Sequence, residues 1–479
     1  MNTDSKKIRW TTFAFMGFSA LWGFGNVLNG FVYFNGIQSI FSWILIFALY
    51  FIPYALMVGE LGSAFKDTKG GVSSWIEQTC GKKIAYYCGW TFWIVHIPYL
   101  ASKGSGALKA LSWVIWQNSE NYDSLPVVAI QLATLAVFLF FAYIASKGLN
   151  PLKKMATLAG SSMFIMSILY IILMFAAPAI NPNASFVKLD FSFSNLVPTF
   201  DWKYITSLSI LIFAVGGIEK LSPYVSNMEN PGKSFPRAII TMTIMVAICA
   251  FLGTIAMGMM FDPQVINAST ESFNHYATNG SYMAFEILGN YYGVGKLFVI
   301  IYALCNLTGQ LSTLVVSIDA PLRMLLDNGT ARQYIPDGLL KQNKHGAYIN
   351  GIIMISILVA IIDLIPCLGI GGVTGIFTML TKLNSVVMPL RYLWVFFAYL
   401  ALRKSKKKFE YDYHFTKNQK LALFFGGWCF FLTAACCILG MYKEGDLFQT
   451  CINVLAPFIF IAIGVILPII AKKQGKTAD

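Results

Sequence analysis

The sequence predicts an all-α membrane protein with twelve spanning helices. Of its 479 residues, 57% are hydrophobic and only 12% are charged, whereas soluble proteins carry about 25% charged residues. Apolar runs of about 20 residues, long enough to cross a bilayer as helices, recur along the whole chain. Basic residues gather in every second loop between these runs, which is the positive-inside pattern of membrane proteins.

The apolar runs follow one another with short connections. We place the spans at residues 10–33, 37–64, 84–116, 125–146, 154–178, 203–228, 236–261, 283–326, 347–366, 372–402, 419–441 and 448–471. An even number of spans puts both termini on one side, and the basic ends of the chain place that side in the cytoplasm. The segments 117–126 and 262–280 contain no Lys or Arg and then lie outside. We expect a multi-pass protein of the inner or plasma membrane of a bacterium.

The composition also excludes several classes of function. The net charge of +13 comes from the loops between spans, where it meets anionic lipid headgroups, so we expect the lipid bilayer and not nucleic acid as a partner. The nine cysteines form no CxxC pair, and the four histidines do not cluster. We therefore predict no cofactor, no metal centre and no enzymatic activity.

Two of the predicted spans are interrupted by glycine and polar residues. The first contains "LWGFGNVLNGF" (21–31) and the sixth contains "FAVGGIEK" (213–220). Glycine costs about 1 kcal/mol relative to alanine inside a helix, and polar groups at bilayer depth need partners or water. We expect both helices to unwind there and line a cavity. The alternative is that the glycines only allow close helix packing.

Paired breaks of this kind predict a transporter. Helices interrupted at corresponding positions of two halves are typical of the binding site of inverted-repeat transporters. Freed backbone amides at a half-helix N-terminus bind a carboxylate, and freed carbonyls bind an ammonium group. An amino acid needs both kinds of partner. The spacing of the breaks therefore favours an amino acid as the substrate.

Two stretches carry a resemblance to a known family. The stretch "GGIEKLSPYVSNMENPGKSFPRAI" (216–239) resembles the sixth-helix signature of the amino acid–polyamine–organocation (APC) superfamily, and "ALMVGELGSAFKDTKGGVSSWI" (55–76) is similar to the end of its second helix. Among its branches, the sequence looks most like the glutamate:γ-aminobutyrate antiporter-like group. The resemblance implies a LeuT-like core in 1–402, with inverted five-helix repeats at about 10–178 and 203–402. Two peripheral helices and a short cytoplasmic tail then occupy 403–479.

The resemblance also implies a substrate site between the first and sixth spans. Amides of residues 23–26 bind the substrate carboxylate, carbonyls around residues 21 and 213–216 bind its ammonium group, and Phe213 is an aromatic gate. Phe24 stands where many members have a small hydroxyl residue, so the pocket has its own shape. The residues implied to bind substrate are Leu21, Gly23, Phe24, Gly25, Asn26, Phe213, Ala214 and Gly216.

Three charged residues join Phe213 as candidates for gating or coupling. Glu219 is either a proton-sensitive acid or one member of a permanent ion pair. Glu60, near the cytoplasmic end of its span, is either an inner gate or a structural pair. Lys103, in the middle of a span, either attracts an acidic substrate side chain or forms a structural pair. His96 lies two helical turns before Lys103 on the same face, so both are candidates to line the pathway.

We expect less specific roles for the remaining polar residues in the spans. Lys220 should point about 100° away from Glu219, toward the cytoplasm or an acid on another helix. Asp363 and Arg391 are ordinary residues near span ends in this interpretation, whereas Lys382 lies close to the middle of its span. Asn306 offers a polar contact next to the first span. Two residues of the eighth span are weak candidates for sodium binding: Thr308 and Ser312.

These observations together predict a secondary active amino acid permease or antiporter that works by alternating access, with acidic amino acid/amine exchange as the first hypothesis. A neutral amino acid permease coupled to protons or sodium is the alternative. A non-transporting sensor or a channel with the same fold is the hypothesis from another class. The coupling ion stays open, and the oligomeric state is a monomer or a homodimer.

Overall fold

The computed structural model describes residues 7–329, 331–368, 386–407, 409–442, 445 and 447–476. Within these ranges the regular structure is helical, apart from one isolated bridge that pairs Ile8 with Met228. Nine helices of the described part are long and apolar enough to cross a membrane. The predicted all-helical fold class is confirmed at this level. Lys382, which we placed close to the middle of its predicted span, lies outside the described residues.

The first part of the chain contains both long helices and short helical turns. In order they are α1 (Trp10–Leu21), α2 (Phe24–Tyr33), η1 (Gly36–Gln38), α3 (Ser39–Ile46), η2 (Phe47–Phe51), α4 (Ile52–Ala64), α5 (Val72–Cys80), α6 (Lys82–Ile94), α7 (His96–Ile115), α8 (Glu120–Asp123), α9 (Val127–Ala145), α10 (Leu149–Ile180) and α11 (Phe193–Leu196). The π-helical turn η2 joins α3 to α4 without a break, so 36–64 forms one apolar segment.

The second part also contains long helices and short helical turns. Its helices are α12 (Trp202–Val215), η3 (Ile218–Asn227), α13 (Pro231–Gly258), α14 (Pro263–Ile266), α15 (Thr270–Tyr291), α16 (Leu297–Leu326), η4 (Ala331–Tyr334), α17 (Ile349–Leu364), η5 (Ile365–Leu368), α19 (Leu390–Lys404), α20 (Gln419–Met441), α21 (Leu447–Ile463) and α22 (Ile466–Lys473).

The nine apolar helices do not include three of the predicted spans, those at 10–33, 84–116 and 372–402. The first is interrupted between α1 and α2. The second is divided between α6 and α7 and carries polar and charged residues along its length. The third lies partly outside the described residues. The first two exceptions thus have a cause in the local structure.

The predicted span 283–326 is wrong at its beginning. Two helices replace it, because Gly293 and Gly295 adopt positive φ angles of 66° and 58° and turn the chain between α15 and α16. Such angles favour glycine, which has no Cβ to clash. The segment 262–280, expected to be a loop, is largely helical, since α15 already begins at Thr270.

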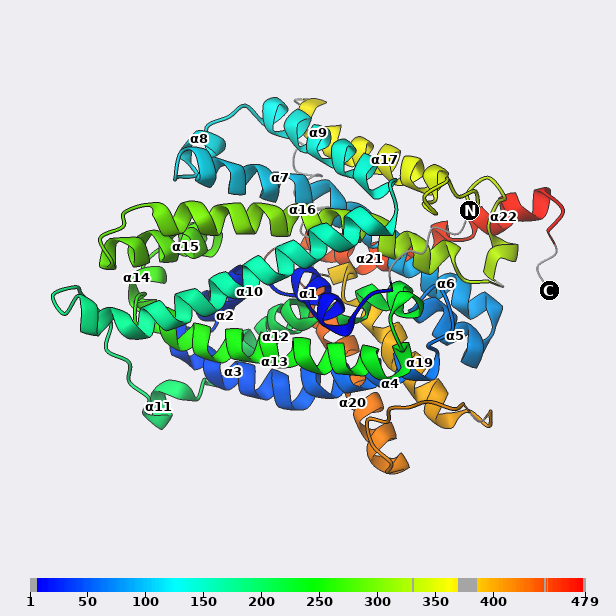
Figure 1. The fold of residues 1–479 in the computed structure, drawn as a ribbon, viewed down its shortest axis with the longest axis horizontal. Helices are drawn as coiled ribbons and strands as arrows, with labels where there is room; N and C mark the ends of the chain where they lie inside the picture. Colours follow the sequence, from blue (N-terminus) through cyan, green and yellow to red (C-terminus); the bar gives the residue numbers. More distant parts are fainter. Residues whose placement is uncertain are drawn as a thin grey trace.

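The broken helices lie at the centre of the bundle (Figure 1). The first half-helix, α1, contacts α10, α13 and α16, which enclose it. The short helices α8, α11 and α14 lie at the left end of Figure 1, and α5 and α22 lie at the right end. Large apolar side chains on the outer helices are exposed, such as Phe140 on α9 and Ile165 on α10. An exposed apolar surface of this kind is what a bilayer covers.

Candidate functional site

The first break is shorter than the sequence predicted. The helix α1 ends at Leu21, Trp22 and Gly23 are extended, and α2 starts at Phe24. Phe24, Gly25 and Asn26 are therefore the first turn of α2 and not an unwound segment. Helices leave their first amides without intrahelical partners, although the Asn26 amide donates to the Gly23 carbonyl at 2.9 Å. The amides of Phe24 and Gly25 are the ones at the positive end of α2.

The second break needs both of its glycines. Gly216 follows α12 in an extended conformation, and a Cβ at this position would clash with the ring of Tyr392, which lies on α19. Gly217 has a φ angle of +112°, which residues with a Cβ rarely adopt. One glycine thus permits the close approach of α19, and the other permits the change from α12 to the 3-10 helix η3.

Asn26 connects the two breaks. Its side-chain Nδ2 donates to the Leu21 carbonyl at 3.5 Å and to the Ala214 carbonyl at 3.4 Å. The Phe213 carbonyl accepts from the Gly216 amide at 3.3 Å. Three of the carbonyls implied for ammonium binding therefore already accept a hydrogen bond each, and a carbonyl oxygen has two lone pairs.

A cavity of about 380 Å³ lies against both breaks. This volume falls in the range of small-molecule sites. All eight residues that the sequence implied for substrate binding line the cavity, and so does Lys103, whereas Glu219 and Glu60 do not. Residues that join them from other helices include Tyr99, Lys109, Lys220, Tyr282, Asn306, Gln310, Arg391 and Tyr392.

Phe24 forms part of an aromatic wall. Its ring centroid lies 4.8 Å from that of Tyr170, 5.1 Å from Phe285 and 5.8 Å from Tyr302. Edge-on and tilted pairs at these distances are favourable. The side chain of Phe24 is thus anchored in a packed cluster of aromatic rings.

Glu219 is an ion-paired residue directly behind the cavity wall. Its Oε1 lies 3.3 Å from Arg391 Nε, and Tyr54 donates to its Oε2. The glutamate side chain is 0% exposed. This geometry supports the permanent ion pair, and whether Glu219 senses protons stays a prediction.

The expectation that Arg391 is an ordinary residue is wrong. It is buried, lines the cavity and donates from Nη1 to His96 Nε2 at 2.8 Å. His96 Nδ1 lies 2.5 Å from the Phe92 carbonyl, so Nδ1 carries the proton and the imidazole is neutral. His96 therefore holds Arg391 and does not line the pathway with Lys103. The available signal was position, since residue 391 lies well inside the predicted span 372–402.

Lys220 also contradicts its expectation. It is 2% exposed, lines the cavity and donates to Ser317 Oγ on α16 at 2.6 Å. The 100° argument assumed an α-helix, but η3 is a 3-10 helix that begins after the positive-φ residue Gly217. Lys103 donates to Gln310 Oε1 at 3.2 Å. The structure therefore brings Lys220 to the cavity beside Lys103.

Glu60 belongs to a separate cluster at the end of α4. Its Oε2 accepts from Arg403 at 2.7 Å and from the backbone amide of Phe415 at 2.8 Å. Burial, reinforced by the negative charge of Glu60, raises the pKa of Tyr413 in the neighbouring loop to about 12, so this phenol stays protonated at neutral pH. The structure supports a structural pair, and a gating role stays a prediction.

The sodium candidates lie on α16. Thr308 Oγ1 donates to the Cys305 carbonyl of its own helix at 2.7 Å. Ser312 is buried, and its Oγ has no hydrogen-bond partner among the described residues. Neither residue lines the cavity. Within the described part of the chain, no group of three His, Cys, Asp or Glu side chains is placed to hold a metal ion.

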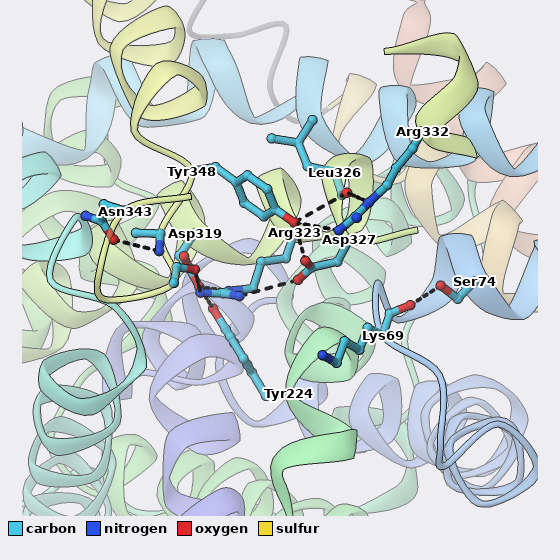
Figure 2. A network of polar contacts seen from close by, with 12 residues as sticks. Lys69, Ser74, Tyr224, Asp319, Arg323, Leu326, Asp327, Arg332, Asn343 and Tyr348 are labelled. Carbon is cyan, nitrogen blue, oxygen red and sulfur yellow. Dashed lines mark hydrogen bonds and ion pairs between the residues drawn. The ribbon is translucent and has the colours of Figure 1, made fainter. Parts of the chain in front are cut away.

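A polar layer that sequence reasoning missed joins η3 to α16 (Figure 2). Asp319 Oδ2 accepts from Tyr224 at 2.6 Å and from Arg323 Nε at 2.6 Å. Arg323 also reaches Asp327 at 3.3 Å, and Tyr348 donates to the same carboxylate. The available signal was the i,i+4 spacing of the acids and the arginine on one helix face.

The fold and cavity define a multi-pass membrane transporter, and the comparisons give its family. The model of the family described as amino acid permease matches residues 8–478. The chain belongs to this family, whose members are transporters and not enzymes, as the resemblance to the APC superfamily predicted.

Three relatives show how far the similarity extends. The chain is 46% identical to the aspartate/glutamate permease AcaP of Lactococcus lactis subsp. cremoris, over 99% of this chain and 97% of the relative. It is 25% identical to the inner membrane transporter YjeM of Escherichia coli, over 82% and 81% of the two chains. It is 22% identical to a glutamate/gamma-aminobutyrate antiporter of Lactococcus lactis subsp. lactis, over 76% and 70%.

Proposed function

We propose that this chain is a secondary active transporter of acidic amino acids that works by alternating access. The observation that carries the proposal is the cavity against both helix breaks, which has an excess of positive charge. Lys103, Lys220 and Arg391 line it, and Glu219 forms an ion pair with the arginine. The 46% identical relative, an aspartate/glutamate permease, supports the acidic class over the neutral one.

The proposed binding mode uses the backbone first. The amides of Phe24 and Gly25 at the start of α2 bind the α-carboxylate of the substrate. The carbonyls of Leu21, Phe213 and Ala214, each with a second lone pair available, receive the α-ammonium group. The half-buried ring of Phe213 closes over the substrate as a gate.

The proposal includes the finer architecture that the sequence predicted. It comprises twelve spans, inverted repeats at 10–178 and 203–402, two peripheral helices after residue 402, and both termini in the cytoplasm. Its support is the position of α8 and α14 at one end of the bundle and of α5 and α22 at the other (Figure 1). The functional unit is a monomer or a homodimer.

Uptake by proteoliposomes tests the function. We expect labelled aspartate and glutamate to enter, and asparagine and glutamine to enter poorly. Uptake that requires glutamate or γ-aminobutyrate inside the vesicles identifies an antiporter, and uptake driven by an imposed proton or sodium gradient identifies a symporter. No uptake of any amino acid under all three conditions would overturn the proposal.

Gly25→Leu tests the first break. A Cβ at Gly25 meets only Ser281 Oγ, at 3.9 Å, so the fold tolerates the change while the larger side chain blocks the start of α2. We expect the variant to keep its melting temperature without ligand and to lose the stabilisation that excess aspartate gives the wild type. Retained stabilisation by aspartate would contradict the binding mode.

A further inference from the structure

Two lysines from different elements meet at one aromatic ring in the cavity wall. Lys103 Nζ on α7 lies 4.9 Å from the centroid of the Tyr99 ring, and Lys220 Nζ on η3 lies 5.3 Å from the same centroid. Both lysines and Tyr99 line the cavity. We propose that Lys103 and Lys220 form a subsite for the side-chain carboxylate of the substrate. This inference rests on the proposed function and names the residues that select the acidic class.

The two ammonium groups donate hydrogen bonds to neutral side chains. Lys220 donates to the Ser317 hydroxyl and Lys103 to the Gln310 amide oxygen, and both acceptors are uncharged. Among the described residues no carboxylate lies within ion-pair distance of either Nζ. The undescribed stretch 369–385 contains no Asp or Glu in its sequence. Cations at bilayer depth are costly unless an anion or water accompanies them, so the pair is completed by an anionic ligand.

The subsite is held in place from behind. Gln310 Nε2 donates to Asn306 Oδ1 at 3.3 Å, and Asn306 Nδ2 donates to the Tyr282 hydroxyl at 2.8 Å. On the other side, Ser317 donates to the Thr313 carbonyl at 2.6 Å. These bonds orient the acceptors that position the two lysines before a ligand arrives. Such preorganisation reduces the cost of ordering on binding.

Separate groups recognise the backbone and the side chain of the substrate, and this separation explains the proposed selectivity. The backbone at the breaks recognises groups that every amino acid has, so it cannot distinguish aspartate from asparagine. Only the side-chain carboxylate distinguishes them, and it requires cations away from the backbone site. A neutral amino acid would leave both lysines unneutralised, which makes its binding unfavourable relative to aspartate.

The experiment compares three single variants in proteoliposomes: Lys103→Gln, Lys220→Met and, as the matched control, Lys109→Gln. Lys109 lines the same cavity from the same helix as Lys103, but its Nζ already faces Asp123 at 3.9 Å. We expect the ratio of aspartate to asparagine uptake to fall by about tenfold or more in the first two variants, as the loss of a charge-assisted hydrogen bond implies. The control keeps the wild-type ratio.

The outcomes separate the two proposals. Wild-type protein that transports no amino acid overturns the proposed function itself. Wild-type transport with an unchanged ratio in Lys103→Gln overturns the subsite alone. An absolute chloride requirement for aspartate uptake assigns the lysines to chloride and also overturns it. Because Lys220 is buried, the uptake ratio of Lys220→Met counts only if the melting temperature of this variant without ligand stays near that of the wild type. If the variant is destabilised, the uptake ratio of Lys103→Gln decides, because Lys103 is only half-buried.

Discussion

Two buried glutamate–arginine pairs use opposite ends of the same helix. Arg391 at the start of α19 pairs with Glu219 beside the cavity, and Arg403 near its end pairs with Glu60. Both glutamates are 0% exposed. They differ in their remaining partners, because Glu60 also accepts from a backbone amide, whereas Glu219 is held by the side chains of Tyr54 and Arg391.

The difference in partners indicates that the two glutamate–arginine pairs have different structural roles. A carboxylate bonded to the main chain loses that bond if it reorients while the backbone stays in place. A carboxylate held by side chains can exchange partners through rotamer changes alone. The Glu60 pair therefore anchors the loop at 409–418 to the end of α4, whereas the Glu219 pair joins side chains of α4 and α19 next to the cavity.

The largest expected effect comes from Arg391→Met. It leaves Glu219 buried with the Tyr54 hydroxyl and without its ion-pair partner, and breaking a buried pair in this way costs about 3–5 kcal/mol. Arg403→Met should cost less, because Glu60 keeps its bond to the Phe415 amide. Unfolding in detergent measures both variants. A larger loss in Arg403→Met would reverse the comparison.

Glu60→Gln should have the next largest effect. The glutamine side chain still offers an oxygen that accepts from the backbone N–H of Phe415, but it has no negative charge to pair with Arg403. We therefore expect a loss of about 1–3 kcal/mol in unfolding free energy. The stabilisation that excess aspartate adds should equal that of the wild type. A change in that increment would show that the Glu60–Arg403 pair also takes part in substrate binding.

Tyr54→Phe should have a smaller effect on stability. It removes one donor from Glu219 and leaves the ion pair with Arg391, which we expect to cost about 1.5 kcal/mol, the low end for a hydrogen bond to a charged group. Because Glu219 then depends on Arg391 alone, the rate of aspartate transport should change more than the melting temperature does. Parallel losses in rate and stability would indicate a purely structural hydroxyl.

Lys66→Met should have the smallest effect. Its ammonium lies 3.3 Å from Asp412, with both side chains about one-third exposed, and pairs of this kind contribute about 0.2–1 kcal/mol. The substitution keeps most of the side-chain volume. It tests whether the Lys66–Asp412 pair, and not only Glu60, holds the loop at 409–418 in place. The rate of limited proteolysis of the loop measures the effect. If the loop of Lys66→Met is cleaved as fast as that of Glu60→Gln, the pair with Asp412 holds the loop as firmly as Glu60 does.

The sequence was enough to locate both helix breaks, because glycine and polar residues are costly at bilayer depth in a continuous helix that faces lipid. It did not reveal that Asn26 joins the breaks, since a bond to the Ala214 carbonyl depends on how two distant helices approach. Arg391 was missed for a related reason. Its burial depends on where Glu219 and His96 lie, and neither periodicity nor composition reports such pairings.

Two further expectations failed because of local geometry. The direction expected for Lys220 follows from α-helical geometry, but the chain after Gly217 forms a 3-10 helix with a different angular spacing. The predicted boundary of α16 lies too early because the apolar residues of α15 continue the run. In both cases a glycine with a positive φ angle changes the path of the chain.

The polar layer between η3 and α16 (Figure 2) has a consequence for the speed of the proposed cycle. Tyr224, Asp319, Arg323 and Asp327 exchange strong bonds with one another in the present conformation. In the proposed alternating-access cycle we expect this layer to open, which would replace those bonds with bonds to water, and then to close again. Conformational steps of this kind limit many turnover rates. We therefore expect the layer to give the proposed cycle a high activation enthalpy, so that the transport rate rises steeply with temperature while substrate affinity changes little.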